Sequence, residues 1–410
     1  MVIKFIKKSI QNKQRNYVFI TQVINALIAL IAGKLIALYI SPEDFGTYNI
    51  QFATYTFFST LLISPFIQFI KTSNTTLLPK IGSSQYLYTL VYIIGITYVL
   101  FISFLYFYYN IFDVFFLVIF LLFIFISTLQ SILSDYLNIH NQIIAFSKLS
   151  LVKSLSGLVF ISIFLVLGMK FMNHVQVLWM MQLAGVVMAT GIFISKYRVI
   201  KTTYKIAYKT FLKKYLRFGT PLIFLALWSW VNNYFDRYAI EYFLGFKDVG
   251  IYNANYGVGS KFFLMLGPIF LVLLTPLVYA KTKKEVKKNT IKNYGIYYFI
   301  LGVPLLLIIY LLKDIIGTLL LSVAYQDGFH IIFWIALSFF IMTFTNLFET
   351  IFYSEQNTKV ILLGNIISAT INIILNILLI PTFGVMGAAL ATCIGFFTHF
   401  IFIYLNFNRL

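Results

Sequence analysis

Five basic residues, Lys34, Lys148, Lys153, Arg237 and Lys261, lie inside long apolar stretches of the chain. A charge near the centre of a bilayer costs about 2.5–3.5 kcal/mol, so such side chains face a bundle interior or a watery cavity. An ammonium group binds an anion as a point charge, whereas a guanidinium can grip a phosphate bidentately. We therefore expect a hydrated cleft, lined by Lys34, Arg237 and one or both of Lys153 and Lys261, that binds an anionic group. Lys148 is expected to snorkel towards the cytoplasm.

A second set of polar residues accompanies these cations in the apolar stretches and is a candidate for cavity lining or ion coupling. Its members are Asn232, Asn233, Asp236, Glu241 and Glu349. Arg237 and Glu241 are four residues apart, so they either neutralise each other on one helix face or leave Arg237 to contact the substrate. Asn372 and Asn376 form a similar polar pair, for which hydrogen bonds between helices are the favoured role.

The composition identifies a polytopic membrane protein, because 60% of the residues are hydrophobic and only 10% are charged, whereas about a quarter of the residues of a soluble domain are charged. Continuous rather than alternating apolar runs of about 20 residues predict spanning helices. Twelve spans are expected, at residues 17–40, 45–70, 86–108, 112–135, 143–168, 175–195, 218–244, 249–279, 294–312, 329–353, 360–380 and 384–405.

The distribution of positive charge predicts the orientation. The N-terminus and every second loop hold 23 of the 31 Lys and Arg residues, and the alternate loops hold 3. Positive charge collects on the cytoplasmic side, so both termini are expected in the cytoplasm. The net charge of +19 is then a topology signal, and nucleic acid is not an expected partner. Residues 201–217 carry Lys or Arg every fourth residue and predict a basic helix on the cytoplasmic membrane surface.

A short sequence is repeated at an offset of 204 residues. Asp44-Phe45-Gly46-Thr47-Tyr48-Asn49 corresponds to Asp248-Val249-Gly250-Ile251-Tyr252-Asn253, and each copy lies in a polar break between apolar stretches. The repeat predicts two lobes of six spans, at residues 1–205 and 206–410. Because six is even, both lobes begin on the same side, so they are parallel repeats related by an axis along the membrane normal.

Several kinds of chemistry have no support in the sequence. There is no Gly-rich loop followed by Lys-Ser or Lys-Thr that would bind a nucleotide. The four histidines lie far apart and show no metal-ligand spacing with acids or with Cys393. The expected loops on the outer side are too short to argue for a catalytic domain. We therefore expect a transporter rather than an enzyme, with no metal and no cofactor apart from a coupling ion, H⁺ or Na⁺.

Three motifs resemble those of polysaccharide flippases, a branch of the multidrug/oligosaccharidyl-lipid/polysaccharide (MOP) exporter superfamily. They are the turn from Ile40 to Asn49, the repeat at 248–253 and Phe383-Gly384-Val385-Met386-Gly387-Ala388-Ala389. The resemblance implies an all-α, MATE-like fold with a V-shaped cavity between two six-helix lobes. It implies alternating-access transfer of undecaprenyl-diphosphate-linked oligosaccharides across the bacterial cytoplasmic membrane for cell-surface polysaccharide synthesis. The implied partners are this polyprenyl-diphosphate-linked glycan and membrane lipids, with other membrane proteins of polysaccharide assembly as further candidates.

The sequence leaves two other functions open. An ion-coupled exporter of organic cations would share the fold, but the cations within the spans disfavour it, since drug exporters of this superfamily generally carry an acid in the N-terminal cavity where this chain has Lys34. A membrane-embedded glycan polymerase or ligase is disfavoured by the short outer loops.

Overall fold

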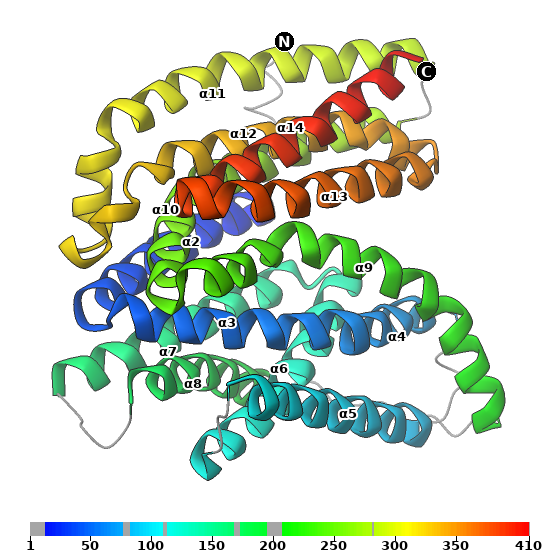
Figure 1. Cartoon of the computed structure of the whole chain (residues 1–410). Helices are drawn as coiled ribbons and strands as arrows, with labels where there is room; N and C mark the ends of the chain where they lie inside the picture. The colour runs from blue at the N-terminus through cyan, green and yellow to red at the C-terminus, as the bar shows by residue number, and fades with distance from the viewer. Residues whose placement is uncertain are drawn as a thin grey trace. The chain divides into compact units, whose positions relative to one another are not determined.

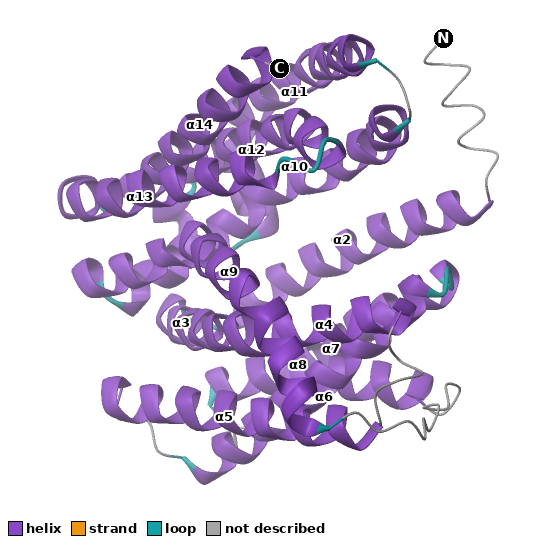
Figure 2. Ribbon diagram, turned by 90° about the vertical axis from the view of Figure 1, so that its right-hand side faces the viewer, coloured by secondary structure: helices purple, strands orange, loops and turns teal. Residues whose placement is uncertain are grey.

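The computed structural model describes residues 13–76, 83–109, 113–167, 173–194, 207–280 and 283–409. Within these ranges the chain is helical apart from short connections, and no strand occurs (Figure 2). Figure 1 labels the main helices. In chain order the elements are α2 (Lys13–Tyr39), α3 (Pro42–Phe58), the π-helical turn η1 (Ser59–Ile63), α4 (Ser64–Thr76), α5 (Ser83–Tyr109), α6 (Val114–Ile139), α7 (Ile143–Leu167), α8 (His174–Ile194), α9 (Tyr208–Leu244), α10 (Phe246–Tyr279), α11 (Lys284–Leu320), the 3₁₀ turn η3 (Val323–Gly328), α12 (Ile331–Ser354), α13 (Thr358–Phe383) and α14 (Val385–Arg409).

The helices confirm the all-α membrane architecture. Eleven helical segments in the described part are long and apolar enough to cross a membrane, the α3–η1–α4 segment counting as one. The remaining expected span, 218–244, lies within α9, which is less apolar because it carries the Asn232–Glu241 polar cluster. Each of the twelve expected spans thus coincides with a helix, and the chain is a multi-pass membrane protein.

The chain forms two compact units. The first contains the described residues up to Leu35 together with Gln51–Leu227, and the second contains Ile36–Ile50 together with Trp228–Leu410. The connection between α2 and α3 therefore packs with the C-terminal helices. The expected lobe boundary at residue 205 lies outside the described residues.

An aromatic core holds the first unit together. Trp179 of α8 is fully buried, and its indole nitrogen donates a hydrogen bond of 2.7 Å to Oε1 of Gln51 on α3. Phe120 of α6 meets the Trp179 ring edge to face with centroids 4.9 Å apart, an arrangement that adds to the free energy of burial. This core sets the spacing of α3, α6 and α8.

The start of α9 contains the described part of the basic segment 201–217. Residues 201–206 of this segment are outside the described part, and residues 208–217 continue directly into the expected span as one helix. Phe211 and Tyr215 are buried against Phe66 and Phe69 of α4, while the basic side chains of this segment are exposed. Phe211 and Tyr215 therefore pack on protein, and the location of this basic segment on the membrane surface stays a prediction.

In the second unit, the α2–α3 connection is tied to the turn η3. The hydroxyl of Tyr325 donates a hydrogen bond of 2.9 Å to the carbonyl of Ile40, and the hydroxyl of Ser322 donates to the carbonyl of Ala37. Burial raises the pKa of the Tyr325 hydroxyl, which keeps this group neutral and able to donate.

Helices α3 and α10 also approach closely at the repeated motif in the second unit. A Cβ on Gly46 would collide with the carbonyl of Phe246, and a Cβ on Gly250 would collide with the carbonyl of Pro42. Both pairs are related by the 204-residue offset, so the contact is reciprocal. The reciprocity is what a local two-fold relation between the motifs requires.

Candidate functional site

A polar cavity of about 460 Å³ lies inside the first unit, between α3–η1–α4, α6 and α7. Polar side chains dominate its wall, six of them serines. The lining residues are Tyr55, Ser59, Ile63, Ser64, Ile67, Gln68, Ser127, Thr128, Gln130, Ser131, Ser134, Asp135, Phe146, Leu149, Ser150 and Lys153. A volume of this size falls within the range of small-molecule sites.

The helical period explains why polar groups gather there. On α6, Ser127, Ser131 and Ser134 are spaced four and three residues apart, and on α7 the same spacing relates Phe146, Ser150 and Lys153. Residues at these intervals share one helix face. Both stripes turn to the cavity, so each of the two helices contributes polar side chains to its wall.

The third wall contains a break in regular helix geometry. The backbone N–H of Ser64 donates to the carbonyl of Ser59, five residues earlier, as in a π-helix. The next residue, Pro65, has no N–H to continue the ladder. This widened turn places Ser59, Ile63 and Ser64 on the cavity wall; π-turns are frequent at functional sites.

Lys153 is the only cation on the described cavity wall. Its side chain is exposed, and no ion pair joins it to a carboxylate in the described part of the chain. Gly185 lets α8 approach the Lys153 backbone, because a Cβ there would lie 2.8 Å from the Lys153 carbonyl. The one acid on the wall, Asp135, forms a 3.1 Å ion pair with Lys71 of α4.

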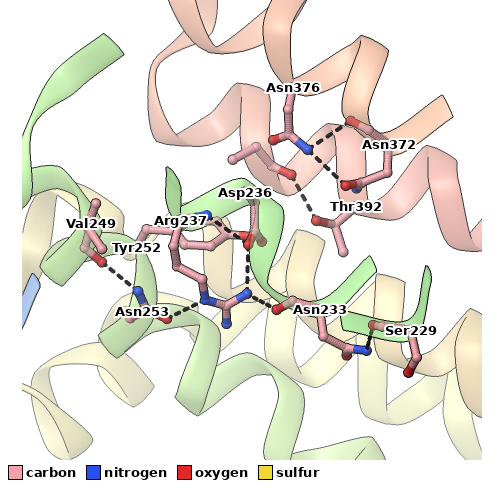
Figure 3. Close-up of polar contacts among 11 residues, drawn as sticks. Ser229, Asn233, Asp236, Arg237, Val249, Tyr252, Asn253, Asn372, Asn376 and Thr392 are labelled. Atoms are coloured by element: carbon pink, nitrogen blue, oxygen red, sulfur yellow. Dashed lines mark hydrogen bonds and ion pairs between the residues drawn. The ribbon is translucent and has the colours of Figure 1, made fainter. Parts of the chain in front are cut away.

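The second unit contains a buried polar cluster around Arg237 (Figure 3). Its guanidinium forms a 2.7 Å ion pair with Asp236, and its Nε donates a 3.0 Å hydrogen bond to Oδ1 of Asn253. It also donates to the carbonyl of Asn233. The other oxygen of Asp236 accepts a 2.6 Å hydrogen bond from the Tyr252 hydroxyl.

Aromatic rings complete the environment of Arg237. Its guanidinium carbon lies 4.5 Å from the centroid of the Tyr256 ring and 5.1 Å from that of Tyr234, within the range of cation–π attraction. Arg237 and Asp236 are only 6% and 3% exposed. Asp236 therefore compensates the charge of Arg237 within the cluster. The structure pairs Arg237 with Asp236 and not with Glu241.

The asparagines follow two patterns. Asn232 joins α9 to α13, since its amide donates a 3.2 Å hydrogen bond to the Asn365 carbonyl and its oxygen accepts one of 3.3 Å from Ser368. Asn376 instead donates to the side chain and carbonyl of Asn372 within α13. The expected interhelical bonds of the Asn372 and Asn376 pair are thus bonds within one helix.

The remaining predicted residues are distributed over both units. Lys34 is partly buried on α2 in the first unit, and Lys261 is partly buried on α10 in the second. Glu349 of α12 is buried, with Oε1 3.2 Å from Nε2 of His399. The expectation that Lys34, Arg237, Lys153 and Lys261 line one cleft stays a prediction.

A family model described as polysaccharide biosynthesis protein matches residues 13–279. The chain belongs to this family. The match confirms the resemblance to the polysaccharide branch of the MOP superfamily.

Solved structures of related fold agree with this membership. The chain aligns with a lipid II flippase, MurJ, in its inward closed conformation, with a TM-score of 0.74, 18% identity and coverage of 95% of this chain and 87% of the other. It aligns with an inward-facing multidrug resistance MATE family transporter of the MOP superfamily, with a TM-score of 0.68, 15% identity and coverage of 94% and 95%. The chain thus has the fold of MOP-type transporters.

A curated relative comes from Methanocaldococcus jannaschii. This uncharacterized membrane protein is 26% identical over 190 residues, which is 44% of this chain. The alignment spans 36% of the length of that relative.

Sequence reasoning missed most of the cavity wall of this family member, although a signal was present. The span from Val114 to Ile139 is rich in Phe, Leu and Ile, yet its second half contains Ser127, Gln130, Ser131 and Ser134. Lys153 was predicted from the sequence because it is charged, whereas these neutral polar residues were not predicted. A polar stripe at helical spacing in an apolar span is the signal that would have found them.

Proposed function

We propose that this protein is a flippase that moves undecaprenyl-diphosphate-linked oligosaccharides from the cytoplasmic to the outer leaflet of the bacterial cytoplasmic membrane by alternating access. Membership in the polysaccharide biosynthesis family and the MOP transporter fold support the transport of a polysaccharide precursor. Both termini would lie in the cytoplasm. The protein acts as a transporter and not as an enzyme in this proposal.

The observation that carries the substrate class is the unpaired Lys153 on the wall of a hydroxyl-rich cavity. Taking a diphosphate out of water is costly unless fixed charges and hydrogen bonds replace its hydration. Lys153 supplies a positive charge that no described carboxylate neutralises, and the serine hydroxyls match a carbohydrate. Lys34 and Lys261 are the further cations that we assign to substrate binding.

Arg237 has a different role in this proposal. Its charge is compensated by Asp236, and its hydrogen bonds go to Asn233 and Asn253. We assign it to holding α9 against α10 rather than to direct contact with the diphosphate. Glu241, which is partly buried and has one oxygen without a hydrogen-bond partner among the described residues, and Glu349 are the candidates for coupling to H⁺ or Na⁺.

The organic-cation exporter has less support from the described acids. A cationic drug needs an available carboxylate, but Asp236 pairs with Arg237 and Asp135 pairs with Lys71. Glu349 lies beside His399. Glu241 has one oxygen without a hydrogen-bond partner among the described residues, but it does not line the cavity that contains Lys153. The chemistry of that cavity thus favours an anionic substrate.

A deletion strain tests the function directly. Loss of the gene should cause a lipid-linked glycan to accumulate on the cytoplasmic side, with mass spectrometry identifying a polyprenyl diphosphate. Reintroducing the wild-type gene should restore the surface polysaccharide. An unchanged lipid-linked pool together with normal surface polysaccharide would reject the proposal, and new sensitivity to cationic drugs would favour the alternative exporter.

A further inference from the structure

The cavity of the first unit has the dimensions of a molecule rather than of an ion. At about 30 Å³ per water, its volume of 460 Å³ corresponds to roughly fifteen waters. A bare phosphate would leave most of this space filled with solvent. A hexose bearing one phosphate is several times larger than a bare phosphate, and it fits within this volume together with part of its hydration.

Gln130 provides an observation independent of the charge of Lys153. Its side chain lines the cavity and is 6% exposed, and no hydrogen bond to its amide occurs within the described part of the chain. Buried amides are normally hydrogen-bonded. A carboxamide that offers both donors and an acceptor at the cavity surface suits the hydroxyl groups of a sugar.

Several wall hydroxyls are restrained in a way that leaves acceptor capacity. The hydroxyl of Ser131 donates a 2.9 Å bond to the carbonyl of Ser127, and the hydroxyl of Ser150 accepts a 3.0 Å bond from the amide of Asn25. Each hydroxyl oxygen has two lone pairs, so these serines are held in place without being saturated. Tyr55 and Phe146 add aromatic surface on the same wall.

The charges along the cavity define a direction. Counting 1.5 Å per residue from the turn between α6 and α7 puts Lys153 roughly 15 Å and Asp135 roughly 6 Å from that turn. The ammonium therefore lies deeper along the helices than the acid, which is itself paired with Lys71. An anionic group is favoured at the Lys153 level, and neutral hydroxyls are favoured towards Asp135 and Gln68.

We propose that this cavity is a binding site for a glycosyl phosphate, with Lys153 contacting the phosphate and Gln130 and the serines contacting the sugar. The inference rests on the proposed function, since the first sugar and adjoining phosphate of a lipid-linked glycan have this chemistry. It adds a subsite wholly within the first unit, and it assigns selection of the first sugar to neutral residues of α6 rather than to the cations.

A binding measurement on the full-length protein in phosphatidylcholine nanodiscs tests the site, with glucose 1-phosphate, glucose and inorganic phosphate as probes. Glucose 1-phosphate should bind at least tenfold more tightly than either glucose or inorganic phosphate. Lys153→Gln should weaken glucose 1-phosphate binding at least tenfold and leave glucose binding within twofold. Gln130→Leu should weaken both sugar probes at least threefold.

Lys148→Gln is the matched control, because Lys148 is an exposed lysine on the same helix that does not line the cavity. It should bind all probes as the wild type does, and Lys153→Arg should restore most of the binding lost in Lys153→Gln. Failure of the wild type to bind glucose 1-phosphate, or equal weakening by Lys148→Gln and Lys153→Gln, would overturn the inference.

Two further measurements separate the possible sources of the phosphate and distinguish the proposed subsite from the proposed function. Adding phosphatidylglycerol to the nanodiscs should not weaken glucose 1-phosphate binding; competition would assign the cavity to bulk anionic lipid and reject the glycan subsite. If the deletion strain accumulates a lipid-linked glycan but Lys153→Gln exports and binds normally, the subsite is wrong while the flippase function stands. If no glycan accumulates, the function itself fails.

Discussion

Gly46 and Gly250 meet where α3 and α10 cross, and each glycine lies against the backbone that precedes the other. The backbone nitrogen of Gly250 is 3.0 Å from the position that a Cβ on Gly46 would occupy, and the Pro42 and Phe246 carbonyls close the two sides. The repeated residues are thus the contact between the two copies of the motif, which explains why the motif needs glycine there.

Replacing either glycine by alanine should destabilise this crossing. Gly46→Ala and Gly250→Ala each place a methyl group against backbone, and overpacking of this kind costs about 1–3 kcal/mol. We expect a lower melting temperature in detergent and less folded protein in the membrane. Gly257→Ala on α10 is the control, because no atom lies within 4 Å of a Cβ at that position. Equal melting temperatures for Gly250→Ala and Gly257→Ala would show that the crossing tolerates a side chain.

The Arg237 cluster predicts that Asp236, and not Glu241, is the partner on which stability depends. Asp236→Asn leaves a buried guanidinium without its counter-charge, a change that costs about 3–5 kcal/mol, and Arg237→Gln should also reduce the amount of folded protein. Glu241→Gln should change stability by less than about 1 kcal/mol. Denaturant or thermal unfolding of the purified variants measures the difference. A larger loss for Glu241→Gln than for Asp236→Asn would contradict the observed pairing.

Lys34→Gln should lower glycan export while the protein remains folded and inserted. Removal of one charged hydrogen bond to a phosphate costs about 1.5–3 kcal/mol, which is roughly a tenfold to hundredfold effect on binding. The amount of surface polysaccharide, normalised to the protein in the membrane, reports the change. Lys213→Gln, at an exposed position near the start of α9, should leave export unchanged. Export by Lys34→Gln at the wild-type rate would place the ligand elsewhere.

Stability should also respond weakly to pH through Glu355, in the connection between α12 and α13. The hydrogen bond from Lys287, with Nζ 2.6 Å from Oε1, lowers the pKa of this carboxyl. A lowered folded-state pKa adds stability above the unfolded pKa of about 4.3, and this stability is lost as the pH falls through the folded value.

The expected size of that effect is small because the Glu355 side chain is 36% exposed, and exposed pairs contribute about 0–1 kcal/mol. Glu355→Gln should therefore lower the melting temperature slightly at pH 7, and the difference from wild type should shrink as the pH falls below about 4.3. High salt at pH 7 should reduce the same difference. A difference that grows on acidification would have the wrong sign for this ion pair.

Much of the architecture follows from local sequence alone. Runs of about 20 apolar residues must be helical in a bilayer to satisfy their backbone, so all twelve expected spans correspond to helices. The motif around Gly46 and Gly250 likewise exposed the internal repeat. These features depend only on composition and on spacing along the chain.

The candidate site depended on contacts that spacing cannot resolve. Arg237 has acids one residue before it and four residues after it, and only the packing of Tyr252 and Asn253 of α10 around the cluster selects Asp236. The cavity likewise needs three walls from separate parts of the first unit, one of them widened at Ser59–Ile63. Helical periodicity determines which face of a span is polar, but it does not determine what that face meets. The sequence therefore determined the spans and which charged residues lie within them. The tertiary structure decided which of these charges is neutralised and which remains available, because that outcome depends on distances between helices.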